Sequence, residues 1–452
     1  MARMLASLRG AVFEPLHCTL THSSKLAYWR ELERTQYKTE DELRHIQWKR
    51  LKEQLRFVYE NNRYYHDTFV RHGVTPDDLK SPGDIGKLPV LTKKDIRDNA
   101  HKIISNGYRR DGLMSFKTGG STGKSLELYI TEECSHLRNA CAIRHDRWTG
   151  WEIGDTVGAV WGNPILPKGI KQNVKHWLLT PTIYLDTMNI SDEAVLEFVK
   201  QWKSAKPTLL FGHAHSIFML AKILDRLGTD LLKPRGILST SMMLMPNERS
   251  YIENVFNIKV TDRYGCEEVS LIASECERHE GMHLNIEHLF IEFIKEDGRP
   301  AESGETGRII VTDLMNKAMP FIRYQIEDMG IPSAHKCSCG RGLPLMDHVV
   351  GRTADFLIRR DGSRVAGISL IENTLTKIPG IEQMQIVQEG LNHIVLNIVA
   401  GRSFTQSAQK DIIVYFQQQF GTGTHVAINQ VSEIEVEKSG KYRFSICKVD
   451  AS

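Results

Sequence analysis

The feature that most constrains this chain is a short segment rich in glycine and hydroxyl side chains, residues 115–125. Glycine allows positive φ and lets backbone N–H groups approach an oxyanion. The segment is not a Walker A loop, because Thr118 stands where that motif requires its first glycine. We therefore expect a phosphate-binding loop of another kind, with an ordinary turn as the alternative. The expected loop residues are Thr118, Gly119, Gly120, Ser121, Thr122, Gly123 and Lys124.

Length and composition indicate a globular chain with more than one domain. Its 452 residues exceed the roughly 250–300 residues that one hydrophobic core supports, so two or three domains are expected. The content of 41% hydrophobic and 25% charged residues is ordinary for a globular protein. A net charge of +3 does not indicate a nucleic-acid-binding protein. Eight cysteines in a chain of this length do not indicate a disulfide scaffold.

The apolar pattern predicts no membrane span, because no run approaches about 18 uninterrupted apolar residues. Residues 1–20 also lack the apolar core and cleavage site of a signal peptide. We therefore expect a cytoplasmic protein.

Periodicity divides the chain into three parts. A helical segment, 1–75, precedes an α/β domain, 76–351, in which strands and helices alternate as in parallel-rich sheets. Strands predominate from 286 to 330, and 352–452 mixes strands and helices as a small α+β domain. The expected strands are 126–130, 156–161, 208–211, 236–239, 289–294, 307–312, 356–359, 384–388, 393–399 and 425–429, and the expected helices include 192–204, 214–228, 369–377 and 405–419.

Two later segments carry residue types that suit a nucleotide. Tyr264 and Gly265 end a predicted strand and could stack on a purine, while Glu268 suits Mg²⁺ bound to phosphate oxygens. Asp328, after another strand, could accept both hydroxyls of a ribose, and Arg323 could pair with it or reach a phosphate. The alternatives are a strand-end turn with solvated glutamates and a surface ion pair.

A hinge and an exposed lysine complete the pattern. The segment 351–355 joins the last predicted domain, where a glycine and small residues could absorb a rotation. Lys441 lies beside Gly440 on a predicted turn, and gains a role only if the small domain carries it onto a nucleotide.

In their order and spacing, these segments resemble the phenylacetate-coenzyme A ligase family of the adenylate-forming superfamily. The resemblance runs from about Trp29 to Cys447 and is closest to the branch associated with capsular polysaccharide biosynthesis. The segments that carry it are 61–65, 88–93, 119–123, 150–155, 264–268, 323–328, 351–352 and 440–443.

The resemblance implies a role for each candidate residue. The loop of residues 118–124 would wrap the phosphates of ATP, Tyr264 and Gly265 would contact adenine, and Glu268 would hold Mg²⁺. Asp328 would bind the ribose with Arg352 nearby. Lys441 would bridge the carboxylate and the α-phosphate, and Asp355 would lie near the hinge of the mobile C-terminal domain. One departure is Met242, which stands where the family usually carries a glutamate.

The implied reaction is activation of a carboxylic acid with ATP as an acyl-adenylate, followed by transfer to a thiol, preferably coenzyme A. Transfer to an amine or hydroxyl, in polysaccharide or natural-product biosynthesis, is the alternative enzyme outcome. A non-catalytic nucleotide-binding scaffold on the same fold is the alternative from another class. The sequence identifies neither the acid nor the oligomeric state.

A zinc site is expected from the cysteine spacing. Cys337 and Cys339 form a C-x-C turn that can chelate a metal, and Zn²⁺ takes four nitrogen or sulfur ligands. Cys276 and His283 are the other candidates, with His279 as the competing histidine. The resemblance also implies such a site, and the alternative is a set of reduced, unliganded thiols.

The acyl pocket is expected at strand ends, where ligand loops gather. Trp161 and Gly162 end one predicted strand, and Gly212, His213 and His215 follow another. The alternative for the histidines is that they cap a helix.

Overall fold

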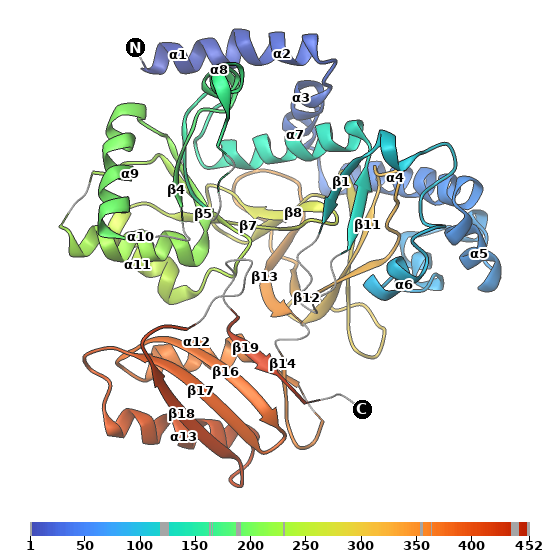
Figure 1. Ribbon diagram of the computed structural model, residues 1–452. Coiled ribbons are helices and arrows are strands. Elements are labelled where there is room, and N and C mark those ends of the chain that lie inside the picture. Colours follow the sequence, from blue (N-terminus) through green and yellow to red (C-terminus); the bar gives the residue numbers. More distant parts are fainter. Residues whose placement is uncertain are drawn as a thin grey trace.

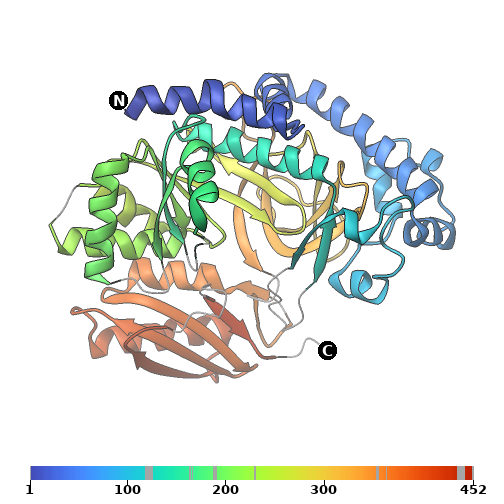
Figure 2. The same cartoon turned by 45° about the horizontal axis from the view of Figure 1, so that its top comes forward.

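The structure is a computed structural model in which a large domain carries a smaller C-terminal domain below it (Figure 1). Figure 2 shows the same two bodies from a second direction. Among the described helices, none is long and apolar enough to cross a bilayer. The structure describes residues 2–117, 126–161, 164, 166–186, 191–228, 231–352, 356–362, 364–434 and 443–449.

The N-terminal segment is helical, as predicted. The helix of residues 40–61 ends just before Asn62, and the next helix starts at residue 63. The Asn62 side chain accepts a hydrogen bond from the Tyr65 N–H and so caps this next helix. The fourth helix begins with a capping box between Thr39 and Glu42. These elements are α1 (Ala2–Leu8), the π-helix η1 (Arg9–Phe13), α2 (Glu14–Leu20), α3 (Lys25–Thr35), α4 (Glu40–Asn61) and α5 (Arg63–Arg71).

The large domain is organised by a mixed sheet of eleven strands in the described part of the chain, ordered β10-β11-β12-β13-β9-β8-β7-β6-β5-β3-β4. The strands β3 to β7 are mutually parallel, and β7 to β13 pair antiparallel. The parallel strands are β3 (Val157–Trp161), β4 (Thr182–Asp186), β5 (Leu209–His213), β6 (Gly236–Thr240) and β7 (Val260–Cys266). The others are β8 (Ser270–Glu275), β9 (Met282–Leu284), β10 (Leu289–Ile294), β11 (Gly307–Asp313), β12 (Tyr324–Ser333) and β13 (Leu345–Arg352).

The two halves of the sheet differ because their connections differ. Parallel neighbours need a crossover, usually a helix, whereas antiparallel neighbours need only a turn. Helices α8 (Gly169–Leu179), α9 (Asp192–Ala205), α10 (Ala214–Arg226) and α11 (Pro246–Phe256) therefore lie between the parallel strands. β6 is buried along its whole length, as expected for a strand covered on both faces. After β7 the connections shorten and the pairing turns antiparallel.

The antiparallel half shares one apolar core with the N-terminal helices and with a separate hairpin, β1 (Met114–Lys117) and β2 (Glu127–Ile130). α3 packs on α7 (Glu132–Trp148), which follows β2. α6 (Lys93–Asp98) begins with a capping box between Thr92 and Asp95. Three short 3-10 helices lie on either side of α6: η2 (Pro76–Asp78), η3 (Pro82–Lys87) and η4 (Arg110–Gly112).

The C-terminal domain has a sheet ordered β18-β17-β16-β19 in its described residues and two helices around a separate core. That core also takes in Met245, Met329 and Val350 of the large domain. Lys222 of α10 and Glu382 of β16 pair across the domains at 2.9 Å. The elements are β14 (Phe356–Ile358), β15 (Arg364–Ala366), α12 (Gly367–Lys377), β16 (Ile381–Gly390), β17 (His393–Ala400), α13 (Gln406–Phe420), β18 (His425–Val431) and β19 (Ser445–Cys447).

The predicted fold class is confirmed: a large α/β domain precedes a small α+β domain. The expected helices at 192–204 and 214–228 are α9 and α10, and the strand expected at 289–294 is β10. The expectation of parallel-rich sheets describes only the strands from β3 to β7.

Candidate functional site

The polar side chains expected to bind a nucleoside lie together on the sheet. The Tyr264 hydroxyl in β7 donates a hydrogen bond to Asp328 Oδ2 in β12 at 2.6 Å. Asp328 is only 8% exposed, so its carboxylate is held by this contact rather than solvated. Arg352 of β13 lies opposite Asp328 in the backbone register. The structure thus brings together three residues that are far apart in the sequence.

Glu268 lies just after β7 and is 6% exposed, so the alternative of a solvated glutamate is wrong. Its Oε1 accepts a hydrogen bond from the Tyr324 hydroxyl at 2.8 Å and lies 3.9 Å from Lys93 Nζ. Burial, and then the charge of Glu268, raise the pKa of Tyr324, so its hydroxyl remains a donor. Lys93 also contacts Glu327 at 2.7 Å. The result is a carboxylate fixed in place, an arrangement that suits a hard cation.

The structure corrects the expectation for Arg323. Its guanidinium pairs with Glu292 at 3.0 Å and donates to the Leu88 carbonyl at 2.5 Å. The side chain is 8% exposed in the ion pair, and its backbone has a φ of 52°. Arg323 therefore holds the segment before α6 against β10, and its guanidinium pairs with Glu292 rather than with Asp328.

Several expected site residues lie outside the described residues: the loop Thr118–Lys124, Gly162, Asp355 and Lys441. The strands that flank the loop are described, and Lys117 of β1 pairs in register with Glu127 of β2. Phe116 of β1 and Tyr264 of β7 contribute to the same apolar cluster.

Two expected site glycines have packing reasons for being glycine. A Cβ on Gly265 would lie 2.6 Å from the Ser270 carbonyl oxygen, and one on Gly212 would lie 2.6 Å from that of Val160. Both distances are too short for any side chain. Close approach of neighbouring strands therefore requires these glycines, whatever else they contact.

The residues expected near the acyl pocket form an aromatic stack at the ends of β3 and β5. The Trp161 ring stacks on Phe211 at 5.4 Å, and its centroid lies 4.0 Å from that of His213. His215 instead contacts Glu248 at 2.6 Å and Gln383 of the C-terminal domain at 3.3 Å. Met242 is half-buried against the apolar core of the parallel half.

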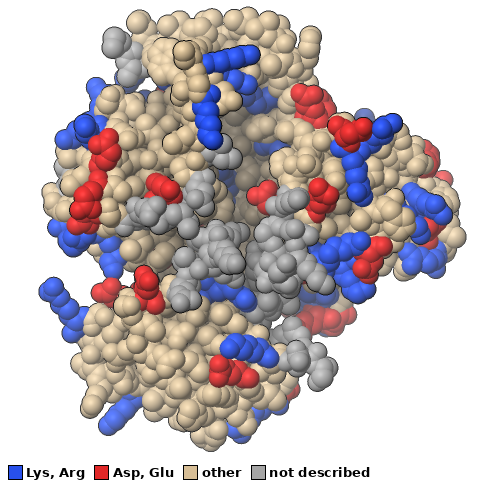
Figure 3. Space-filling view, viewed as in Figure 1, with Lys and Arg blue, Asp and Glu red and all other residues tan. Residues whose placement is uncertain are grey.

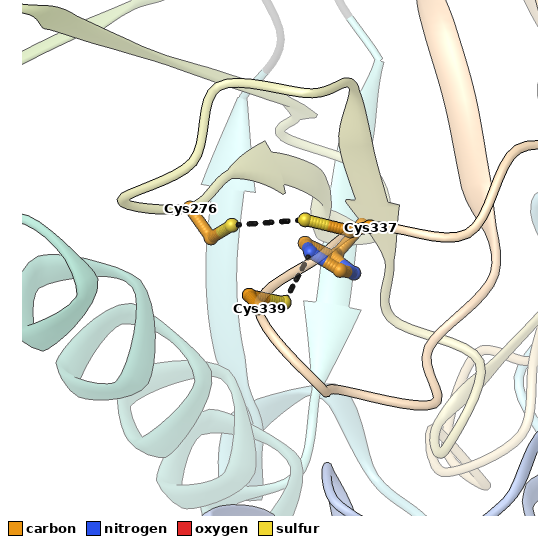
Figure 4. A group of neighbouring side chains, drawn as sticks. Cys276, Cys337 and Cys339 are labelled. Carbon is orange, nitrogen blue, oxygen red and sulfur yellow. Dashed lines mark hydrogen bonds between the residues drawn. The ribbon is translucent and has the colours of Figure 1, made fainter.

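A second cluster combines three thiols and one imidazole. Cys276 Sγ lies 3.6 Å from Cys337 Sγ, and Cys339 Sγ lies 3.4 Å from His283 Nε2. All four donor atoms lie within 4.8 Å of one another (Figure 4). The candidates expected from the sequence thus come together in the structure. His279 is not among them, because it contacts Glu275 at 3.3 Å.

The surroundings of this Cys/His cluster orient its ligand atoms. The Leu343 carbonyl lies 3.2 Å from His283 Nδ1, which leaves Nε2 directed at the thiols. Burial lowers the pKa of His283 to about 4, so the imidazole is neutral, and burial raises the pKa of Cys276 to about 11. A bound cation would offset the cost of thiolates there.

The same region ties the N-terminal helices to the sheet. Arg341 donates to the Gln36 side chain at 3.1 Å, and its guanidinium lies 4.7 Å from the Trp148 ring. A Cβ on Gly342 would lie 1.8 Å from the Lys38 carbonyl oxygen. The turn after Cys339 therefore packs directly on the segment between α3 and α4.

Lys93 and Tyr324 are the site residues that sequence reasoning did not single out. Lys93 follows the Thr92 cap of α6, and Tyr324 follows Arg323. Their signal in the sequence was their place inside the segments 88–93 and 323–328. A local sequence pattern cannot reveal their contacts with Glu268, which lies more than 50 residues from each of them.

Comparisons with known proteins show which proteins the chain is similar to. Residues 357–448 match the family model of the CapK C-terminal domain. The chain is 24% identical to Protein CapK of Staphylococcus aureus over 98% of this chain and 96% of that protein. It is 26% identical to a phenylacetate-coenzyme A ligase of Aromatoleum evansii, covering 79% of this chain and 81% of that one.

Among solved structures, the chain resembles a 2-hydroxyisobutyryl-CoA ligase in the postadenylation state with an acyl-AMP. The TM-score is 0.74 at 19% identity, over 92% of both chains. The chain is therefore similar in sequence to phenylacetate-coenzyme A ligases and in fold to a coenzyme A ligase that binds an acyl-adenylate. The expected resemblance to phenylacetate-coenzyme A ligases and to a CapK-like branch is confirmed.

Proposed function

We propose that this chain activates a carboxylic acid with ATP and transfers the acyl group to coenzyme A. The observation that carries the proposal is the buried polar array across β7 and β12, where Tyr264 holds Asp328 and Tyr324 holds Glu268. Burying carboxylates is costly unless they are held by partners, and two fixed carboxylates, one on β12 and one just after β7, suit a nucleotide with its cation. Relatives and structural neighbours that are ligases of this class support the same reading.

In the first step, a carboxylate oxygen of the substrate attacks the α-phosphorus of ATP. A P–O bond forms, the bond to the β-phosphate bridge breaks, and pyrophosphate leaves. Asp328 binds the ribose hydroxyls, with Arg352 nearby, and Tyr264 and Gly265 contact adenine. The loop of residues 118–124 surrounds the phosphates, and Lys441 contacts the α-phosphate and the attacking carboxylate, where negative charge develops. Glu268 would hold Mg²⁺, which supplies positive charge at the phosphate oxygens.

In the second step, the thiol sulfur of coenzyme A attacks the acyl carbon and AMP leaves, with the thiol proton lost to solvent. No protein nucleophile is needed. We place the acid near the stack of Trp161 and His213, with Gly162 and Gly212 at the same strand ends. We propose a domain boundary between residues 351 and 352, with Asp355 near the hinge of a mobile C-terminal domain.

The Cys/His cluster is proposed as a structural zinc site. Three sulfurs and one imidazole nitrogen give the four soft donors that Zn²⁺ takes in closed sites. Because this set supplies every ligand, the site would stabilise the fold rather than bind substrate.

The central test is pyrophosphate exchange over a panel of aryl, acyl and amino acids. Lys441→Ala should abolish exchange while leaving ATP binding largely intact, because the lysine acts on charge that develops during the reaction. Lys448→Ala is the matched control, since Lys448 lies on the same terminal segment but pairs with Glu389 at the surface. ATP binding without exchange for any acid would favour the non-catalytic scaffold instead.

A second enzyme outcome, amide or ester formation, is favoured by the match to the CapK C-terminal domain. Once an acid is found, product analysis with coenzyme A, amines and sugar hydroxyls separates the outcomes. A thioester supports the primary proposal, whereas an amide or ester formed without coenzyme A supports the second.

A further inference from the structure

The N-terminal helices carry a row of apolar side chains on their outer surface that the described residues of the large domain leave exposed. They recur at every fourth position through α1, η1 and α2, and all are between 43% and 72% exposed. Isolated exposed apolar residues are normal, but a contiguous row of this length is not. The row consists of Met4, Leu8, Val12, Leu16 and Leu20.

The π-helical turn keeps this row on one side. In an α-helix of 3.6 residues per turn, a spacing of four advances by about 40° at each step and would wind the row around the helix. A π-helical turn contains more residues, so four residues make less than one full turn there and the direction of the side chain rotates backwards. η1 (Arg9–Phe13) lies in the middle of the row and offsets part of the drift from the α-helical steps on either side. The local geometry therefore presents five apolar side chains together.

Helix α8 extends the same surface. No residue of α8 is buried, although it carries Ile170, Val174 and Trp177 at helical spacing, 85%, 49% and 51% exposed. α8 packs on η1, and the Arg9 guanidinium lies 5.2 Å from the Trp177 ring. Both helical elements lie at the upper end of the molecule (Figure 1). We call the exposed apolar side chains of α1–α2 and α8 the apical face.

The exposed charges on the two segments that form the apical face are of one sign. Lys168, Lys171 and Lys175 repeat along α8 beside its apolar row. The sequences 2–22 and 164–181 contain a single acidic residue, Glu14, which is buried and paired with Lys25. Figure 3 shows basic side chains within an otherwise uncharged upper end.

We propose that the apical face binds the surface of an anionic lipid bilayer, with α1–α2 and α8 lying in the interface. Interfacial helices combine an apolar face with lysines and arginines beside it, and often carry tryptophan. Acidic lipid headgroups complement the lysines, and acyl chains take the leucines and Ile170. A second copy of the chain is disfavoured, because it would bring like charges together. Nucleic acid is disfavoured because it offers no partner for aliphatic side chains.

Co-sedimentation of the full chain with vesicles tests the proposal. We expect binding to mixed phosphatidylglycerol and phosphatidylcholine vesicles, with weaker binding to phosphatidylcholine alone and at high salt. The double variant Leu16→Asp/Ile170→Asp should lower the affinity at least about tenfold on mixed vesicles. Lys171→Glu/Lys175→Glu should lower it about tenfold or more on mixed vesicles and little on phosphatidylcholine alone.

Leu196→Asp is the matched control, since Leu196 on α9 is 51% exposed, as Leu16 is at 52%, but lies off the apical face. It should bind vesicles like the unmodified chain, and all variants should keep the same melting temperature and pyrophosphate exchange. Absence of sedimentation with either vesicle, or unchanged binding by both double variants, would overturn the proposal. So would a dimer, seen by light scattering without lipid, that Leu16→Asp/Ile170→Asp abolishes, because the face would then join two copies.

Discussion

The two polar clusters of the large domain lie on the same sheet but are built in opposite ways. The Cys/His cluster takes its donors from β9 and from the turns after β8 and β12, and each donor atom faces another donor. In the cluster of Asp328 and Glu268, each carboxylate is held on one side by a tyrosine hydroxyl. The first set offers four ligand atoms, whereas among the described residues the second offers only fixed carboxylates.

This difference separates a structural role from a catalytic one. Closed four-donor sites contribute folding free energy, whereas reactive sites keep positions for substrate and cation. Loss of a ligand in the Cys/His cluster should therefore cost stability first. Loss of a carboxylate in the nucleotide cluster should cost activity at nearly constant stability. Exchanged outcomes, with unfolding caused by loss of a carboxylate and loss of activity alone caused by loss of a Cys/His ligand, would contradict this assignment of roles.

The largest effect is expected for Cys337→Ser. Serine has nearly the same size but is a poor zinc ligand, and the bound metal would contribute folding free energy directly. We expect loss of stoichiometric zinc and a free energy of unfolding lower by about 3 kcal/mol or more. Metal analysis together with denaturant unfolding measures both.

Two controls accompany that prediction. His279→Ala removes a histidine close to the cluster that contacts Glu275 instead, and Cys447→Ser removes a half-buried thiol of the C-terminal domain. Both should retain zinc and lose little stability. Unmodified protein that is fully stable without metal would show that the cluster is a set of reduced thiols.

Glu268→Gln should give the next largest effect, on activity. The amide keeps the size of the side chain and an acceptor for the Tyr324 hydroxyl but removes the charge that would hold Mg²⁺. We expect pyrophosphate exchange to fall about 10²–10³-fold, in the range of lost electrostatic stabilisation of a transition state. The melting temperature should change little.

Glu267→Gln is the matched control, because Glu267 is the adjacent glutamate and is exposed. Its exchange rate should equal that of the unmodified chain. If Glu268→Gln unfolded the protein while exchange per folded molecule stayed constant, Glu268 would be a structural residue like the ligands of the Cys/His cluster.

The sequence predicted the elements with a clear period and the residue types of both clusters. Helix α9 and strand β10 follow from apolar spacing alone, and the four donors of the Cys/His cluster from ligand chemistry. Partners across the sheet were less accessible. Arg323 was expected to pair with Asp328, five residues away, or to reach a phosphate, yet its guanidinium pairs with Glu292. A positive φ at Arg323 redirects the chain there, and local spacing does not report such a turn.

Burial was the other quantity that the sequence did not supply. Gly265 was expected to contact adenine, but its lack of a side chain is already required by the Ser270 carbonyl. The sequence also did not predict that the apolar row on α1–α2 shares one exposed face. A spacing of four drifts around a regular α-helix, and the π-helical turn of η1 offsets part of that drift.

Tyr264→Phe should give the smallest effect, and it tests the role of Asp328 most directly. It removes the hydroxyl that donates to Asp328 at 2.6 Å and keeps the ring that would stack on adenine. A hydrogen bond to a charged group contributes about 1.5–3 kcal/mol, so we expect about a tenfold rise in KM for ATP with the KM for the acid unchanged. Tyr251→Phe is the control, because Tyr251 donates to the exposed Asp225 at 2.7 Å on the far side of the parallel half. A rise in KM for the acid instead of ATP would show that Asp328 contacts the acid and not the ribose. An equal effect of both variants would show that general stability, not the orientation of Asp328, sets the rate.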